Sequence, residues 1–361
     1  MASIHIARQL EAQHSKADHM KWAEQKSVVR PGPLSSVSRV LCFFFLLVAL
    51  AFVLDIVISS GLRRVKTSGF GVWNNIVDGR INADIVISGS SRALTHYDSR
   101  IIQDRTGLTT FNIGLNGSQT DMQFARLNTY LRHNTKPSLL ILNLDLFSFQ
   151  TTHGGVYDPG QYMAYLQEPT IYVALMRINP DTWKARYLPL YGYAVEGLRF
   201  TWLLGVMGYL GWSPVEDHFL GFNPRYLSWT GDFERFKDIN PNGVRFEIEP
   251  DGVREMEELL RLCQEKRIAV LLVYSPEYAE MQALTSNRTQ IFSKFEDLRE
   301  RFDAGMWDYS ASPISALREK FYNSQHLNAG GAAAFSKDLA ARIAADPVLG
   351  KLTAIREVTP K

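Results

Sequence analysis

The sequence predicts an α/β protein, in which helices cover both faces of a parallel sheet and one membrane-spanning helix lies near the N-terminus. Three observations support this expectation. Short apolar runs rich in β-branched residues alternate with helical patterns, as in parallel sheets. One long apolar segment precedes this alternation. A long aromatic stretch interrupts it, so an insertion within the sheet domain is expected.

The composition is that of a globular protein and excludes several functions. The chain has 361 residues, 46% hydrophobic and 21% charged, which is enough for one to three domains. Its net charge of +2 gives no general attraction to nucleic acid, so no nucleic-acid partner is expected. Cys42 and Cys263 alone cannot build a disulfide framework or a cysteine-rich metal site. Neither a metal nor a cofactor is predicted.

The long apolar segment covers residues 40–62 and contains one acid, Asp55. It is long enough to cross ~30 Å of hydrocarbon. We expect an uncleaved signal anchor rather than a cleaved signal peptide, because the polar leader is long and no A-x-A-like site follows. Basic residues flank both ends, so charge does not set the orientation. The expected organisation is a leader over 1–38, an anchor over 39–62 and one domain over 63–361.

The strands and helices of the domain are predicted from short apolar runs and from helical spacing. Apolar side chains repeat at helical spacing over residues 119–132 and 253–266. Ligands bind beyond the carboxyl ends of the strands in such sheets. Five runs are expected to be buried strands: residues 84–88, 110–113, 139–144, 269–274 and, more weakly, 305–307.

Polar residues follow three of these strands, and a histidine lies near the C-terminus. The first strand ends in Gly89-Ser90-Ser91-Arg92, the second leads to Asn116 and Gly117, and Asp145 follows the third. His326 lies within the stretch F-Y-N-S-Q-H-L-N-A-G-G. A simpler interpretation is a helix cap at Ser90 or Ser91 and a loop histidine. If these groups instead converge at one edge of the sheet, they predict an active site.

A serine hydroxyl attacks a carbonyl when a base takes its proton and donors hold the oxyanion. Ser91 is the candidate nucleophile and His326 the candidate base, with activity falling as pH drops through about 6.5. The backbone N–H groups of Ser91 and Gly117 are candidate oxyanion donors. We expect Arg92, Asn116 and Asp145 to contact substrate at the same edge.

Three short stretches resemble the SGNH/GDSL hydrolase superfamily: Gly89-Ser90-Ser91, residues 112–118 and the histidine stretch ending at Gly330. The resemblance covers roughly residues 80–150 and 265–345 and implies a three-layer αβα, flavodoxin-like sheet. It is greatest for the membrane-anchored branch, which includes the teichoic-acid D-alanyl transfer protein and SGNH proteins of exopolysaccharide O-acetylation. That branch implies a bacterial single-pass protein of the cytoplasmic membrane, with its C-terminal domain outside. It also implies a polysaccharide acceptor and a polytopic membrane-bound O-acyltransferase as partner.

The sequence departs from this superfamily at two positions. Asn323 stands three residues before His326, where an aspartate is usual, so either Asn323 or Asp308 is expected to orient the histidine. The asparagine of the third block is absent, because the third strand exits through Asp145 and Leu146. Both losses are compatible with slower acyl transfer by a Ser-His pair, or with lost chemistry.

The interruption covers about residues 149–246 and is rich in tyrosine and tryptophan. We expect a helical cap whose aromatic side chains contact sugar, membrane or a partner. Three functions remain open from the sequence. The first is an O-acyltransferase that moves an acyl group, acetyl in the simplest case, onto an extracytoplasmic glycan. The second is an esterase of the same fold, and the third is a non-catalytic subunit that holds a polymer or partner.

Overall fold

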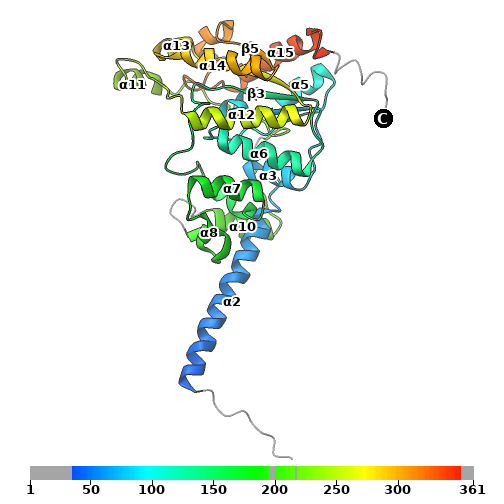
Figure 1. Ribbon diagram of the computed structural model, residues 1–361. Helices are drawn as coiled ribbons and strands as arrows, with labels where there is room; N and C mark the ends of the chain where they lie inside the picture. Colours follow the sequence, from blue (N-terminus) through cyan, green and yellow to red (C-terminus); the bar gives the residue numbers. More distant parts are fainter. Residues whose placement is uncertain (1–34, 195–199, 216–217, 351–361) are drawn as a thin grey trace, which may run out of the picture. The chain divides into compact units, whose positions relative to one another are not determined.

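The computed structural model describes residues 35–194, 200–215 and 218–350. The chain divides into two units, Met1–Leu50 and Ala51–Lys361. Of the first unit, only residues 35–50 are described, and all but the first of them belong to helix α2 (Ser36–Leu62). The sheet belongs to the second unit (Figure 1). Every predicted site residue lies in this unit as well.

Five parallel strands form one sheet in the order β2-β1-β3-β4-β5. All five predicted runs are strands, with ends that differ by at most one residue. This is the strand order of flavodoxin-like sheets, in which the crevice lies where the chain reverses direction, between β1 and β3. The strands are β1 (Ile85–Ser88), β2 (Thr110–Asn112), β3 (Leu139–Asn143), β4 (Ala269–Tyr274) and β5 (Gly305–Asp308).

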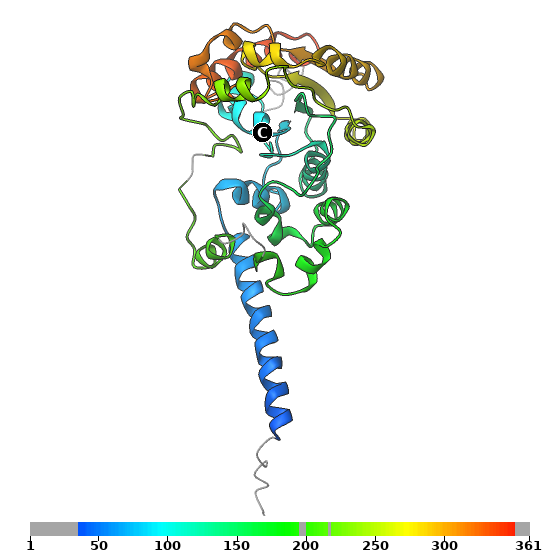
Figure 2. The same ribbon diagram turned by 90° about the vertical axis from the view of Figure 1, so that its left-hand side faces the viewer.

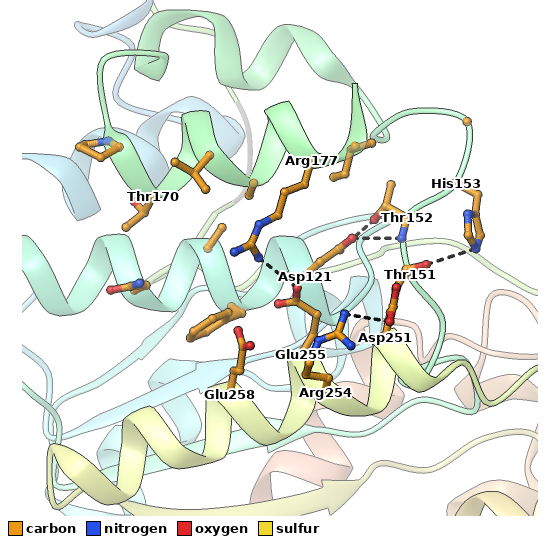
Figure 3. A pocket seen from close by; sticks show the side chains of 18 residues that line it. Asp121, Thr151, Thr152, His153, Thr170, Arg177, Asp251, Arg254, Glu255 and Glu258 are labelled. Atoms are coloured by element: carbon orange, nitrogen blue, oxygen red, sulfur yellow. Dashed lines mark hydrogen bonds and ion pairs between the residues drawn. The ribbon is translucent and has the colours of Figure 1, made fainter. Parts of the chain in front are cut away.

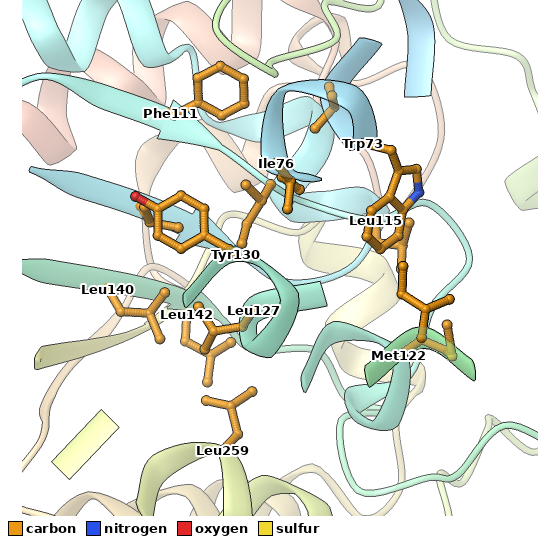
Figure 4. Close-up of a cluster of buried hydrophobic side chains, with 14 of the residues drawn as sticks. Trp73, Ile76, Phe111, Leu115, Met122, Leu127, Tyr130, Leu140, Leu142 and Leu259 are labelled. Atoms are coloured by element: carbon orange, nitrogen blue, oxygen red, sulfur yellow. The ribbon is translucent and has the colours of Figure 1, made fainter. Parts of the chain in front are cut away.

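Alternate side chains of the strands enter two separate cores, because successive residues of a strand point to opposite faces. Val86 and Leu140 pack with α3 (Ser68–Val77), α6 (Thr120–His133), α12 (Pro250–Glu265) and α14 (Arg288–Arg301), partly shown in Figure 4. Ile85 and Ile141 pack with α4 (Ser91–His96), α5 (Ser99–Thr106) and α15 (Ala329–Ala345). The domain is therefore a three-layer αβα structure.

The two helices predicted from spacing are α6 and α12. Helix α12 begins at Pro250, three residues before the apolar pattern, because proline at the first helical position lacks only an N–H that would be unpaired there anyway. Its buried residues Met256, Leu259, Leu260 and Cys263 form the expected face. Shorter elements complete this half of the chain: α13 (Ala279–Leu284), η2 (Pro313–Ala316) and η3 (Arg318–Lys320).

Helix α2 has 27 residues, and among the described residues it alone is long and apolar enough to cross a membrane. Its last turn packs closely on α10 (Thr201–Tyr209). In Figure 2, α10 is the short green helix to the left of the end of the blue helix. A Cβ on Gly61 would lie 1.7 Å from the carbonyl oxygen of Gly205, so only glycine permits this approach. The leader over residues 1–34 lies outside the described residues.

The described part of the insertion is helical. It contains η1 (Pro159–Tyr165), α7 (Pro169–Ile178), α8 (Thr182–Tyr187), α9 (Tyr191–Ala194), α10 and α11 (Asp232–Ile239). Between α10 and α11 the chain returns to the carboxyl edge of the sheet. The Asn112 N–H donates to the Leu220 carbonyl at 2.8 Å, and the Asn223 N–H donates to the Leu94 carbonyl at 3.0 Å. The insertion therefore borders the predicted site.

Candidate active site

The turn after β1 separates the roles of its two serines. Gly89 has a φ of +141°, and a Cβ there would lie 2.9 Å from the Cβ atoms of Ala93 and Asn143, so a larger residue would clash. Ser90 is buried, and its hydroxyl accepts the Arg92 N–H at 3.2 Å, capping α4. Ser91 is half-buried. The capping interpretation therefore applies to Ser90 and leaves Ser91 available for chemistry.

Ser91 and His326 meet although they lie 235 positions apart in the chain. The Ser91 Oγ lies 2.7 Å from His326 Nε2. On the opposite side of the ring, Nδ1 lies 2.9 Å from the Oδ1 of Asn323. The hydroxyl and the amide thus contact different nitrogens, which is the arrangement that a serine-histidine relay requires.

The amide of Asn323 has a defined orientation. Its Oδ1 accepts the backbone N–H of His326 at 2.9 Å and that of Gln325 at 3.1 Å. Backbone N–H groups only donate, so the atom they share is the amide oxygen. His326 Nδ1 must then carry the proton that it donates to Asn323. Its Nε2 is left as an acceptor for the Ser91 hydroxyl.

The surroundings of His326 favour the neutral ring. Burial, with the positive charges of Arg92 and Arg225, lowers the pKa of His326 to about 3. A general base must be unprotonated to take a proton. A ring with this pKa stays neutral well below pH 6.5, so the loss of activity is now expected at a lower pH than the usual pKa of histidine predicts.

A second histidine, His96, lies beside His326 and was not among the predicted site residues. The Leu327 N–H donates to His96 Nε2 at 3.0 Å, so His96 Nδ1 carries the proton and contacts Ser275 Oγ at 2.8 Å. The ring of His96 meets that of His326 edge to face, with centroids 6.1 Å apart. Burial, Arg92 and His326 lower the pKa of His96 well below its usual range. His96 thus positions the backbone beside His326 as a neutral group.

The loop after β2 is fastened to the serine turn. The Leu115 N–H donates to the Gly89 carbonyl at 2.9 Å. The buried side chain of Asn112 donates to the Ala93 carbonyl at 2.7 Å and accepts the Gly114 N–H at 2.8 Å. These bonds hold the loop against the first turn of α4.

Three unpaired donors lie on these two neighbouring segments. Within residues 35–194, 200–215 and 218–350, the backbone N–H groups of Ser91 and Gly117 make no hydrogen bond, and neither does the Asn116 amide. Gly117 has a φ of +61°, and a Cβ there would lie 2.5 Å from the Tyr157 ring. The donors predicted for an oxyanion are therefore free at the edge that carries Ser91.

Arg92 and Asp145 do not line the surface of the site. Their exposed fractions are 3% and 1%, and Arg92 Nη1 lies 3.4 Å from Asp145 Oδ1. Arg92 also donates to the carbonyls of Leu144, at 3.5 Å, and Ser275. The expectation that both residues contact substrate is therefore wrong. They form a buried ion pair beneath the serine turn, because each charge needs the other once it has left water.

Asp308 is not the group that orients His326. It ends β5, where its Oδ1 accepts the backbone N–H of Ser310 at 2.8 Å and also the Ser310 hydroxyl. The Ser310 hydroxyl in turn accepts a hydrogen bond from Arg288. Of the two candidates, Asn323 contacts the histidine, and Asp308 caps a turn.

Two further residues lie near His326. The ring of Tyr322 stacks on the imidazole with centroids 5.4 Å apart. Arg225 comes from the insertion, and its carbonyl accepts the Ala329 N–H at 2.8 Å. Tyr322 could have been noticed from its place in the histidine stretch. Arg225 carries no sequence signal, because only the return of the insertion brings it to this edge.

A cavity of about 800 Å³ lies elsewhere, lined by residues of α6, α7 and α12 (Figure 3). Its opposite charges pair with one another: Arg177 contacts Glu255 at 3.2 Å and Arg254 contacts Asp251 at 2.8 Å. No cluster of histidine, cysteine and acidic residues suited to a metal ion occurs in the part of the chain that the structure describes.

The same cavity contains a threonine next to a histidine, but their geometry differs from a relay. Thr151 Oγ1 lies 3.2 Å from His153 Nε2, and both carboxylate oxygens of Glu249 lie 3.0 Å from that same nitrogen. A base that accepts a proton at one nitrogen is oriented at the other. The Ser91 edge is therefore the candidate active site.

No protein-family model matches the chain, and no curated protein matches it. Two solved structures are similar to it. One, from Bacteroides fragilis NCTC 9343, is assigned as an acylhydrolase; it shares 10% identity, with 74% of this chain and 87% of that chain covered and a TM-score of 0.35. The other is a GDSL-like lipase from Bacteroides thetaiotaomicron VPI-5482, with 9% identity, coverage of 72% and 87%, and a TM-score of 0.32.

Proposed function

We propose that this protein is a serine-dependent O-acyltransferase that moves an acyl group, acetyl in the simplest case, onto a cell-surface or secreted polysaccharide. The observation that carries the proposal is the hydrogen-bonded chain from Ser91 through His326 to Asn323. The free donors at Ser91, Gly117 and Asn116 add to it, because acyl transfer passes through an oxyanion that needs such donors.

The reaction proceeds in two halves. Ser91 Oγ attacks the acyl carbon while His326 Nε2 takes the hydroxyl proton, and the N–H groups of Ser91 and Gly117 bind the oxyanion. The donor's leaving group departs with the proton from His326 and leaves an acyl-serine. A sugar hydroxyl then attacks the acyl carbon and gives its proton to His326, which returns it to Ser91 Oγ. The ester moves to the sugar, and the enzyme is restored.

The acceptor decides between a transferase and an esterase, because water in the second half would release free acid instead. We favour transfer for one reason: Asn323 gives His326 a neutral partner, which stabilises the imidazolium less than a carboxylate would. That arrangement suits a slower enzyme with a dedicated acceptor.

Helix α2 is proposed to anchor the domain outside the bacterial cytoplasmic membrane, with residues 1–38 inside the cell. Helix α10 packs on the end of α2 and exposes Trp202, Leu203 and Tyr209. Aromatic rings favour membrane interfaces, which supports placing this face at the bilayer surface.

A partner is proposed from the origin of the acyl group. Activated acyl donors such as acetyl-CoA are made in the cytoplasm, and one helix such as α2 encloses no passage for them. A polytopic membrane-bound O-acyltransferase would carry the acyl group across and load Ser91. The resemblance to membrane-anchored SGNH proteins supports the same partner.

The two serines of the turn provide a matched test of the chemistry. Ser91→Ala should lower release of p-nitrophenol from its acetate ester by about a hundredfold or more and abolish labelling by a fluorophosphonate. Ser90→Ala should cost about 1 kcal/mol of stability through the lost cap and keep labelling. Loss of labelling in Ser90→Ala alone would refute the assignment. No labelling of the wild type would favour a non-catalytic subunit.

The orientation has its own test. Alkaline phosphatase and green fluorescent protein are fused separately to the C-terminus. Phosphatase activity without fluorescence is expected, because phosphatase folds only outside the cytoplasm and the fluorescent protein only inside. The reverse result would place the site among the cytoplasmic donors and remove the need for a carrier.

A further inference from the structure

A cavity of about 310 Å³ is lined in part by α4 and by the loop after β2. Its lining includes Leu94, one turn after Ser91 on α4, and Asn116, next to Gly117. Arg126 of α6 and Arg225 of the insertion line it as well. Pockets that bind small molecules start at about 300 Å³, so this volume suits a single sugar-sized group.

Arg126 is a buried cation that has no anionic partner among the described residues. Its exposed fraction is 2%, and its guanidinium lies over the Trp73 ring, 4.4 Å from the centroid. Within the described residues the guanidinium makes no hydrogen bond and no ion pair, and its Nε is fully enclosed. Burial lowers the pKa of Arg126 to about 10, although Tyr162 and Tyr165 oppose this change. It is thus still charged at neutral pH, in a place where an unpaired charge is costly.

Arg225 faces the same cavity and is half-buried. Its Nε is enclosed without a hydrogen bond, and its side chain forms no ion pair within the described residues. Asp158 is the one carboxylate among the described lining residues, and it makes no ion pair with either arginine. The described lining therefore has more positive than negative charge.

We propose that this cavity binds a carboxylate or phosphate group of the substrate, so that the acceptor is an acidic glycan. The inference rests on the proposed function, since it names the substrate class of the same site. Guanidinium groups bind both anions through paired N–H donors. An anion here would neutralise Arg126 and hold the neighbouring sugar beside Ser91, where Arg225 links the cavity to His326.

Binding is measured by calorimetry on the full-length protein in detergent, with three probes. Methyl glucuronide presents a carboxylate, glycerol 3-phosphate presents a phosphate, and methyl glucoside presents neither. At least one anion should bind, and the glucoside should bind much more weakly. Arg126→Met and Arg225→Met should each weaken anion binding by about tenfold to a hundredfold, the scale for a hydrogen bond to a charged group.

Controls separate this effect from general damage. Arg177→Met, in the other cavity, should bind the anion as the wild type does, because Arg177 already pairs with Glu255. Arg126→Lys should keep part of the affinity by keeping the charge. If Arg126→Met does not fold, anion binding by Arg225→Met still tests the proposal, because Arg225 is only half-buried. Equal binding of the glucoside, no anion binding, or wild-type affinity in both methionine variants would overturn the proposal.

The probes also distinguish a carboxylate from a phosphate. Together with fluorophosphonate labelling, they separate the acidic acceptor from the proposed acyl transfer. Binding of only methyl glucuronide would identify an acidic sugar, and binding of only glycerol 3-phosphate would identify a phosphate-containing polymer. Ser91→Ala should bind the anion unchanged. If the anion binds but fluorophosphonate does not label Ser91, the site stands and the acyl chemistry fails. If labelling succeeds and no anion binds, the acyl chemistry stands and the acidic acceptor fails.

Discussion

Arg92 and Arg126 are equally buried, and each lies over an aromatic ring, but they differ in their polar partners. Their exposed fractions are 3% and 2%, and each guanidinium lies over an aromatic ring, 4.5 Å from Tyr274 and 4.4 Å from Trp73. Arg92 contacts a carboxylate and two carbonyls, whereas Arg126 contacts no acceptor among the described residues. Burial acts on both, but Tyr274, Asp145 and Glu277 raise the pKa of Arg92, while the pKa of Arg126 falls to about 10.

The difference teaches how to separate a structural charge from a binding one. A buried cation whose partners all belong to the protein is satisfied before any ligand arrives. A buried cation without partners carries a desolvation cost that only an added anion can offset. Arg92 therefore supports the serine turn, and Arg126 is left for the substrate.

The largest expected effect is on stability. Arg92→Met should lower the free energy of unfolding by about 3–5 kcal/mol, because it leaves Asp145 buried without its cation. Urea unfolding of the full-length protein in detergent, followed by tryptophan fluorescence, measures this loss. The double variant with Asp145→Asn should lose less than the sum of the single variants.

Arg126→Met is the matched variant. It removes an equally buried guanidinium, and its free energy of unfolding should stay within about 1 kcal/mol of the wild type, since only the contact with Trp73 is lost. A loss equal to that of Arg92→Met would contradict the comparison, because Arg126 would then have protein partners after all.

The second effect is the dependence of activity and stability on pH, and it follows from the burial of His326. Activity should be flat from pH 8 to pH 5, because His326 stays neutral until far below its usual pKa of about 6.5. The unfolded chain binds that proton near pH 6.5, and the native state does so only near pH 3. Between these values the unfolded state binds more protons, so the free energy of unfolding falls as pH falls. A sigmoidal loss of activity centred near pH 6.5, with chemistry rate-limiting, would contradict this.

The smallest effect comes from adding the missing carboxylate. Asn323→Asp would place a negative charge beside His326 Nδ1, which now lies 2.9 Å from the amide oxygen. The pKa of His326 should rise, the acid limb should move toward neutral pH, and the rate at pH 8 should increase by about tenfold. Asp308→Asn is the control and should change neither, because Asp308 contacts Ser310. An effect of Asp308→Asn as large as that of Asn323→Asp would reverse their assignments.

The strands, and the polar residues that follow them, were predictable because both depend on the local sequence pattern. Ile85, Val86 and Ile87 are β-branched and all fully buried, as expected for a strand covered on both faces. Glycine at position 89 and the cap at Ser90 follow from the same local rules. The pairing of Ser91 with His326 was also expected, because parallel strands bring their carboxyl ends to one edge.

Arg92 and Arg126 show what the sequence determined and what only the tertiary structure decided. The sequence determined the elements that carry them, since the helix cap in the Gly89–Arg92 turn indicates α4 after β1 and helical spacing predicts α6 after β2. Whether each guanidinium meets a carboxylate was decided by packing, because Asp145, which follows β3, lies beneath the serine turn and no carboxylate of the described residues reaches Arg126. The choice of Asn323 over Asp308 was decided in the same way. Desolvation and Coulomb energy depend on distances between segments far apart in the chain, and those distances exist only after the layers have assembled.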